Sequence, residues 1–243
     1  MTTPVPPSLV SLDDIRTAHA SIRPHVVRTP LVPFPLEGFW LKPESLQPTG
    51  AFKLRGAFNA MLSLTPDARI IAGAGTVGLE ILEDLPDAGT ILVPVSGGGL
   101  ISGVAAAVKQ LRPQTRIIGV EPEEAADAHA SFKTGQRVTY TVEQVGRTLA
   151  DGLRVQHLGD LNWAHVQAYV DDINTVSETD LRRAAREATL RTRLVTEPSG
   201  AVTIAAALFH RDTLGATGPL VAVLSGGNLD PRLLIELLTT GEA

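Results

Sequence analysis

Cysteine is absent from the 243-residue sequence, which excludes disulfide bonds, thiolate zinc sites and cysteine nucleophiles. An excess of positive charge is also missing: the formal net charge of −5 argues against a nucleic-acid-binding protein, which usually presents a basic face. Apolar runs such as Thr90–Val95 are too short to span a membrane. Residues 1–7 lack the pattern of a signal peptide. We therefore expect a cytoplasmic protein with neither a nucleic acid nor a membrane as partner.

Short apolar segments alternate with amphipathic ones along the chain, and 44% of the residues are hydrophobic, enough to form a core. The pattern predicts strands at Gly38–Glu44, Arg69–Ala72, Thr90–Val95, Arg116–Glu121, Val166–Val170 and Leu220–Leu224. It predicts helices from Ser11 to about Ala20 and at Ala51–Leu64, Thr76–Leu85, Leu100–Leu111, Ala125–Lys133, Glu178–Arg193 and Ala201–His210. This alternation is typical of an α/β fold, an open and mostly parallel sheet with helices on both faces. No linker divides the chain, so residues 1–243 are predicted to form a single domain.

Two glycine-rich turns are candidates for an anion site. Gly73–Gly78 matches the G-x-G-x-x-G pattern of dinucleotide-binding proteins, although a tight strand-to-helix turn explains it more simply. Gly97–Gly99 is followed about 20 residues later by Glu121, roughly where a ribose-binding acid would lie. Because three successive glycines carry an entropic cost, they favour a loop that lets backbone N–H groups approach a phosphate. The motifs alone leave open whether a pyrophosphate or a single phosphate binds.

Lys53 lies one turn into the helix that is predicted to follow Thr49-Gly50. The positive end of a helix disfavours the charged amine and makes it more nucleophilic. An isolated helical lysine is usually a solvated surface residue, so its neighbours decide. The segment Leu41-Lys-Pro-Glu-Ser-Leu-Gln-Pro-Thr-Gly-Ala-Phe-Lys-Leu-Arg-Gly-Ala57 resembles the cofactor-lysine segment of the fold-type II pyridoxal 5′-phosphate (PLP) enzymes. It is most similar to that of the threonine/serine dehydratases and serine racemases.

Further segments extend the resemblance over nearly the whole chain; they are Val27–Leu31, Ile71–Glu80, Thr148–Leu153, Glu197–Ala201 and Ser225–Asn228. It implies the large domain of the fold-type II PLP, or tryptophan synthase β-like, fold. It also implies that Gly73–Gly78 is a structural strand–helix turn. A Rossmann-type oxidoreductase, which rests on that glycine motif alone, is then the least favoured function.

The resemblance also implies roles for individual residues. Lys53 would hold PLP as a Schiff base and act as the catalytic residue, with Phe52 beside it in the cofactor site. The loop residues Gly97, Gly98, Gly99 and Leu100 would bind the PLP phosphate. The hydroxyl of Ser225 would meet the pyridine nitrogen, where a neutral serine is a weaker electron sink than a carboxylate.

A divalent-cation site is implied by the same resemblance. Gly119–Pro122 with Asp127 is similar to the metal site of the serine racemases. Glu121, Asp127 and the backbone carbonyl of Ala125 would be the ligands, an oxygen set that suits magnesium or calcium better than zinc. Solvated strand-end and helix charges explain the two carboxylates equally well.

The chemistry implied by the resemblance is removal of water from L-threonine or L-serine, which yields a 2-oxo acid and ammonia. After the amino-acid substrate displaces Lys53 from the cofactor, the freed amine can remove the Cα proton. The family also implies a homodimer with a small amino acid as substrate.

One departure from the family concerns the small domain, whose Ser-Ser-Gly-Asn-His-type loop holds the substrate carboxylate. Nothing resembling that loop stands between the predicted helix 51–64 and residue 70, so the small domain is predicted to be absent, with the join near residues 64–69. The second racemase base would be lost with it, which makes a serine racemase-like isomerase the weaker alternative. A PLP-binding remnant without catalysis is the other alternative, and a partner chain could supply the missing domain.

Overall fold

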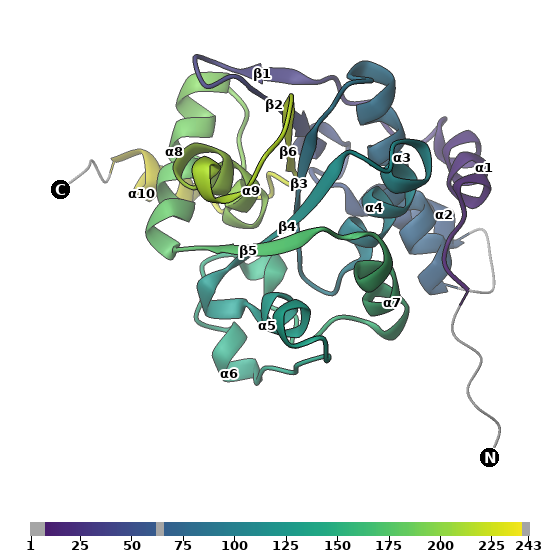
Figure 1. The fold of residues 1–243 in the computed structure, drawn as a ribbon. Helices are drawn as coiled ribbons and strands as arrows, with labels where there is room; N and C mark the ends of the chain where they lie inside the picture. The colour runs from purple at the N-terminus through teal and green to yellow at the C-terminus, as the bar shows by residue number, and fades with distance from the viewer. Residues whose placement is uncertain (1–7, 62–65, 240–243) are drawn as a thin grey trace.

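The computed structural model describes residues 8–61 and 66–239, which form an α/β structure around one six-stranded sheet (Figure 1). The strands lie in the order β1-β2-β6-β3-β4-β5. Their bounds are β1 Val32–Phe34, β2 Phe39–Pro43, β3 Thr90–Pro94, β4 Arg116–Pro122, β5 Asp172–Val176 and β6 Leu220–Leu224. Only β1 runs antiparallel to its neighbour among the described strands. The predicted mostly parallel sheet is therefore confirmed.

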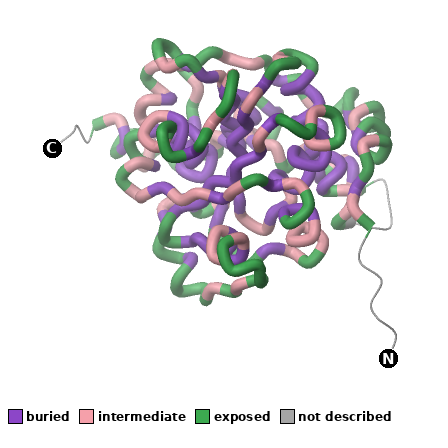
Figure 2. The backbone as a smooth tube through the Cα atoms, viewed as in Figure 1, coloured by how far each residue is buried: buried purple, intermediate pink, exposed green. Residues whose placement is uncertain are grey.

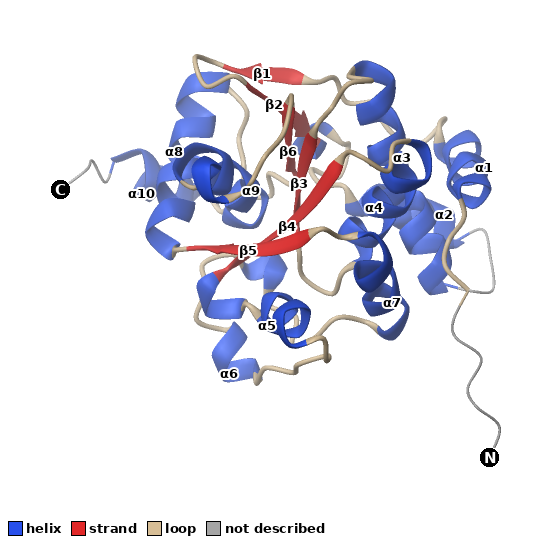
Figure 3. Cartoon of the chain, viewed as in Figure 1, coloured by secondary structure: helices blue, strands red, loops and turns tan. Residues whose placement is uncertain are grey.

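Helices cover both faces of the sheet, as Figure 3 shows, and this prediction is also confirmed. One face carries α8 (Glu178–Thr192), α9 (Pro198–Phe209) and α10 (Pro231–Thr239). The other carries α1 (Leu12–Ile22), α2 (Lys53–Met61), α3 (Pro66–Asp84), α4 (Gly99–Leu111) and α7 (Asp160–Tyr169). The shorter helices α5 (Asp127–Thr134) and α6 (Val142–Val145) lie beyond the β4–β5 edge (Figure 1). None of the described helices has the length and apolar character needed to cross a membrane.

The core follows from the alternation of side chains along the strands. Ile91 and Val93 of β3 pack with α3 and α4, whereas Leu92 between them packs with α8 and α9. Every residue of β3 and β6 is buried, and the centre of the tube in Figure 2 is coloured as buried, which explains why the sequences of these strands are continuous apolar runs.

The predicted strand Arg69–Ala72 is wrong, because these residues and the predicted helix Thr76–Leu85 belong to the single helix α3. The glycine motif 73–78 is therefore helical and forms no strand–helix turn. Its small residues serve close helix packing: a Cβ at Gly73 would lie 2.5 Å from the carbonyl oxygen of Arg55 on α2. The predicted join near 64–69 falls partly outside the described residues, which omit 62–65, as does the end of the predicted helix 51–64.

The predicted strand Val166–Val170 is wrong as well. Its apolar residues form the end of α7, where Val166 is buried, and the strand β5 follows at Asp172–Val176. β5 pairs in parallel with β4, with Ile173 opposite Gly119. A short apolar run does not by itself distinguish a buried helical turn from a strand, so tertiary pairing decided the outcome.

A buried cluster of four charged side chains joins β2, α2 and α3. This ion cluster consists of Lys42 on β2, Glu44 just after it, Arg55 on α2 and Glu80 on α3, each at most 1% exposed. The Arg55 guanidinium donates to Glu44 (Nε to Oε2, 2.7 Å) and to Glu80 (Nη1 to Oε1, 2.7 Å). Lys42 Nζ donates to Glu80 Oε2 at 2.7 Å. Two cations and two carboxylates thus balance one another away from water.

The surroundings of the ion cluster complete its hydrogen bonds. Thr29 Oγ1 donates to Glu44, and the carbonyl oxygen of Thr29 accepts from Lys42 Nζ at 2.6 Å. Burial by itself would lower the pKa of Arg55, but the bonds and charges of Glu44 and Glu80 raise it overall. Burial lowers the pKa of Lys42, against the attraction of Glu80.

Replacing Glu80 by glutamine tests the importance of this balance. Since Lys42 and Arg55 would then share one carboxylate, we expect a loss of about 3–5 kcal/mol in the free energy of unfolding, measured in urea. Glu83→Gln on the same helix is the matched control, because Glu83 is 53% exposed where it pairs with Arg28. That pair should contribute at most about 1 kcal/mol. Equal losses in the two variants would contradict the expectation.

Candidate active site

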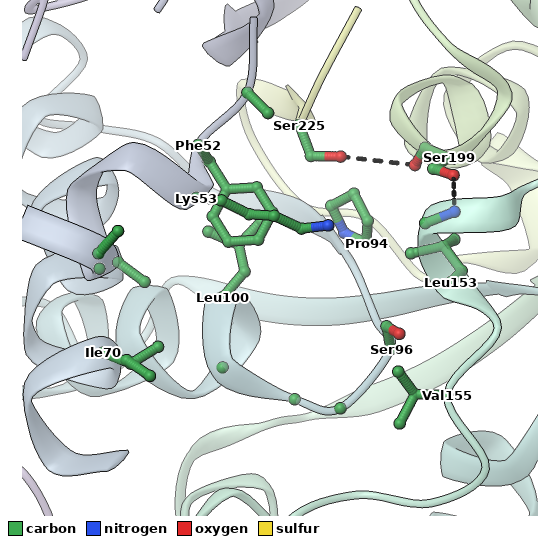
Figure 4. A pocket seen from close by; sticks show the side chains of 18 of the residues that line it. Phe52, Lys53, Ile70, Pro94, Ser96, Leu100, Leu153, Val155, Ser199 and Ser225 are labelled. Carbon is green, nitrogen blue, oxygen red and sulfur yellow. Dashed lines mark hydrogen bonds between the residues drawn. The ribbon is translucent and has the colours of Figure 1, made fainter. Parts of the chain in front are cut away.

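A cavity of about 390 Å³ opens where the carboxyl ends of β3 and β6 meet the start of α2 (Figure 4). Ligand sites of open parallel sheets lie at this end of the strands. The lining residues come from six parts of the chain: 51–60, 70–74, 94–100, 152–155, 197–199 and residue 225. All seven residues predicted to bind the cofactor contribute to it, namely Phe52, Lys53, Gly97, Gly98, Gly99, Leu100 and Ser225.

Lys53 is the first residue of α2, and its exposed side chain extends into the cavity (Figure 4). The turn before it is fixed from two sides. Gly50 has a φ of +75°, and a Cβ there would lie 2.2 Å from Asn228 Oδ1, so that only glycine fits. The N–H of Phe52 donates to the carbonyl oxygen of Ser225 at 3.0 Å. The start of α2 is thereby tied to the end of β6.

The glycine loop forms the opposite wall of the cavity. Gly98 has a φ of +91° and precedes the first turn of α4, whose leading N–H groups have no partner within the helix. The carbonyl oxygen of Gly97 accepts from the N–H of Gly159 at 3.2 Å and from Asn162 Nδ2. Because these bonds hold the loop and α4 contributes its positive end, this wall is suited to bind a phosphate.

Two hydroxyl groups stand at the ends of the cavity. Ser225 Oγ, 5% exposed as a residue, donates to the carbonyl oxygen of Ser199 over 3.5 Å. Ser96 Oγ is buried at the start of the glycine loop and has no hydrogen-bond partner among the described residues. Figure 4 shows Ser225 and Ser96 on different sides of the Lys53 side chain. A molecule with polar groups at both ends fits this arrangement.

Four polar or positioning residues of the cavity were not predicted individually: Ser96, Gly152, Glu197 and Ser199. Gly152 donates its N–H to Ser199 Oγ at 2.9 Å, which ties the turn at residues 151–153 to the start of α9. Two of the segments that resemble the family, 148–153 and 197–201, contain three of these residues. That resemblance was the signal that pointed to them.

The predicted metal ligands lie at the end of β4, outside the cavity. Glu121 is fully buried, and its carboxylate accepts from the N–H groups of Ala128 (3.3 Å) and His129 (2.7 Å) at the start of α5. Both carboxylate oxygens of Asp127 are buried and have no hydrogen-bond partner among the described residues. Ala125, two residues before Asp127 in the sequence, is buried as well.

Burial raises the pKa of both carboxyl groups. The pKa of Glu121 is raised well above its ordinary value, first by burial and then by repulsion from Asp127. Burial raises the pKa of Asp127 to about 7. The described residues contain no group of three or more His, Cys, Asp or Glu side chains arranged to hold a metal. Glu121 and Asp127 are thus close enough to repel each other, and the carboxylate oxygens of Asp127 remain unpartnered among the described residues.

Comparison with known proteins assigns the chain to a family. The model of the family described as "Pyridoxal-phosphate dependent enzyme" matches residues 65–226, more than half of the chain. The chain belongs to the pyridoxal-phosphate dependent enzyme family. Lys53 precedes the matched residues, so its place in the site rests on the structure of the cavity and on the resemblance of its segment.

Individual relatives agree with this assignment. The chain is 41% identical over 177 residues to an L-threonine ammonia-lyase of Thermotoga maritima, covering 72% of this chain and 42% of the relative. It is 43% identical over 168 residues to a serine racemase of Arabidopsis thaliana, covering 68% and 50%. The crystal structure of a T.th. threonine deaminase superposes with a TM-score of 0.85 at 36% identity, covering 90% of this chain and 98% of that one. The chain spans about half the length of the curated relatives it matches.

The residues of the cavity fit PLP, the cofactor of this family. The cofactor's aldehyde requires an amine, its phosphate an anion site and its ring nitrogen a polar partner. Lys53, the start of α4 with the unpartnered Ser96 hydroxyl, and Ser225 meet these requirements in turn. A Cβ at Gly98 would lie 2.8 Å from Leu158 and Asn162, which shows how closely the loop is packed from behind.

Gly98→Ala tests the phosphate loop. The left-handed φ costs roughly 1–2 kcal/mol for a residue with a Cβ, and the contacts with Leu158 and Asn162 would also displace the loop. We expect the affinity for PLP, measured by absorbance titration, to fall at least about tenfold. Gly135→Ala is the control, since Gly135 has a φ of +71° but nothing within 4 Å of an added Cβ. Unchanged affinity in Gly98→Ala would contradict the assignment.

Proposed function

We propose that this protein is a PLP-dependent lyase that eliminates water from L-threonine or L-serine, after which the dehydrated product takes up water to give a 2-oxo acid and ammonia. The observation that carries the proposal is the Lys53 amine in a cavity whose opposite wall is the glycine-bounded start of α4. Relatives named as threonine ammonia-lyase and serine racemase support a small hydroxylated amino acid as substrate.

The residues predicted to bind the cofactor each have a task in this proposal. Lys53 holds the cofactor covalently and, once released by the substrate, its amine removes the Cα proton. Bound PLP supplies the electron sink that makes this proton acidic. The N–H groups at the start of α4 and the Ser96 hydroxyl bind the phosphate, and Ser225 Oγ meets the ring nitrogen. Phe52 lines the cavity beside Lys53.

The connection between α2 and α3 bears on how well these residues work. Since α3 begins at Pro66, five residues after α2 ends at Met61, we propose that residues 1–243 form the large domain alone, without a small domain inserted there. No described residue of the cavity other than Lys53 is a cation, so a substrate carboxylate lacks a charged partner there. Water exclusion would also be incomplete. Turnover is therefore expected to be slow, and a PLP-binding protein without catalysis is the second candidate. We also propose that the protein is a homodimer and is located in the cytoplasm.

The test of the Schiff-base lysine is spectroscopic. The protein purified with PLP should show the absorption band of the lysine-bound cofactor, and Lys53→Ala should lose it. Lys133→Ala is the control, because Lys133 pairs with Asp172 on the surface. An identical spectrum in Lys53→Ala and the unmodified protein would refute the assignment.

Catalysis is tested separately with L-threonine and L-serine, PLP and magnesium. We expect 2-oxo acid to accumulate above the level of the Lys53→Ala variant. If the band depends on Lys53 but no product exceeds that control, the second candidate, binding without catalysis, replaces the first.

We also propose a magnesium or calcium ion on Glu121, Asp127 and the carbonyl of Ala125. The unpartnered Asp127 carboxylate supports it. Added Mg²⁺ or Ca²⁺ should raise the midpoint of thermal unfolding, and Asp127→Asn should abolish most of this increase. Asp160→Asn on the exposed start of α7 is the control. An equal increase in Asp127→Asn and the unmodified protein would exclude this site.

A further inference from the structure

Glu197 is a second ionisable group in the cavity, and the proposed mechanism does not use it. Among the described lining residues, Glu197 and Lys53 are the two that carry a charge. Glu197 precedes the first turn of α9, yet its side chain makes no capping hydrogen bond to that helix. Helix capping therefore does not explain why a glutamate stands here.

The backbone next to Ser225 is shaped around the Glu197 carboxyl. A Cβ at Gly226 would lie 2.3 Å from Glu197 Oε1 and 3.0 Å from its Cδ, so the carboxyl occupies the space that a side chain at 226 would fill. The N–H of Glu197 donates to the carbonyl oxygen of Gly226 at 3.2 Å. Gly200 permits the same approach, because a Cβ there would lie 2.4 Å from that oxygen. The carboxyl is thus held against the residue that follows Ser225.

Burial and nearby charges shift the pKa of the Glu197 carboxyl group. Burial raises its pKa above the ordinary value, and repulsion from Asp151 of the short helix η3 (Asp151–Leu153) adds to the increase. Lys53 from α2 and the N–H of Asn228 act in the opposite direction. Asp151 and Lys53 are the charged groups that face Glu197 from the elements packed around it.

We propose that Glu197 is the residue that tunes the cofactor's ring nitrogen, acting beside Ser225. This inference rests on the proposed function, since it needs PLP bound through Lys53 with its ring nitrogen at Ser225. A neutral serine does not favour a positive ring nitrogen, whereas a carboxylate nearby does. As the pH rises and Glu197 loses its proton, a negative charge develops next to Ser225. The protonated ring nitrogen, which is the stronger electron sink, is then stabilised.

Absorption spectra of the PLP-loaded protein over a range of pH test the proposal. In the unmodified protein the band of the bound cofactor should change with pH, and the pKa of Glu197 should set the midpoint of this change. Glu197→Gln keeps the size of the side chain and should remove this transition. Asp151→Asn removes the repulsion that raises the pKa of Glu197, so it should move the midpoint toward lower pH. Glu143→Gln is the matched control on the exposed helix α6 and should change nothing.

The outcomes separate this inference from the proposed function. If the unmodified protein shows no band that depends on Lys53, the proposed function fails. If the band depends on Lys53 but its pH profile is the same in Glu197→Gln and Asp151→Asn as in the unmodified protein, the role of Glu197 is refuted and the proposed function stands. Because Asp151→Asn leaves Glu197 in place, it decides the matter even if Glu197→Gln does not fold. A shift toward higher pH in Asp151→Asn would also overturn the inference.

Discussion

The ion cluster of Lys42, Glu44, Arg55 and Glu80 is the constraint on which the position of the active-site helix depends. Charges without water are costly unless each finds partners, and here both carboxylates bind Arg55 while Glu80 also binds Lys42. Arg55 follows Lys53 by two residues on α2. The helix therefore cannot slide or turn without separating buried charges, and the otherwise exposed Lys53 starts from a fixed backbone position.

The remaining walls of the cavity are brought to α2 by close backbone contacts. Because Gly50 and Gly226 have no side chains, the turn before Lys53 can contact the turn after β6. Gly73 does the same for α3 against α2. Close backbone packing thus shapes the walls of the cavity. This packing holds the residues that are proposed to bind a cofactor in place.

The sequence predicted the candidate site better than it predicted the elements around it. Lys53, the glycine loop and Ser225 stand in segments that resemble those of the family, and all of them line one cavity. The sequence predicts two elements wrongly. The glycines of α3 are typical of turns, and only the close approach of Gly73 to Arg55 on α2 explains why they stand in a helix. The few apolar residues at the end of α7 suit a strand as well as a helical turn. Both errors concern local patterns that neighbouring elements override.

By itself, the sequence determined the alternation that produces a parallel sheet, the family, and the lysine and glycine segments of the site, because these depend on local pattern and residue type. The tertiary structure decided which groups meet. Arg55 and Lys42 are ordinary cations in the sequence, and only folding places them between Glu44 and Glu80 without water. Glu197 likewise gains its raised pKa from burial, and its place against Gly226, the residue after Ser225, from segments distant along the chain. Electrostatic effects of this kind depend on distance and solvent exposure, which no local pattern encodes.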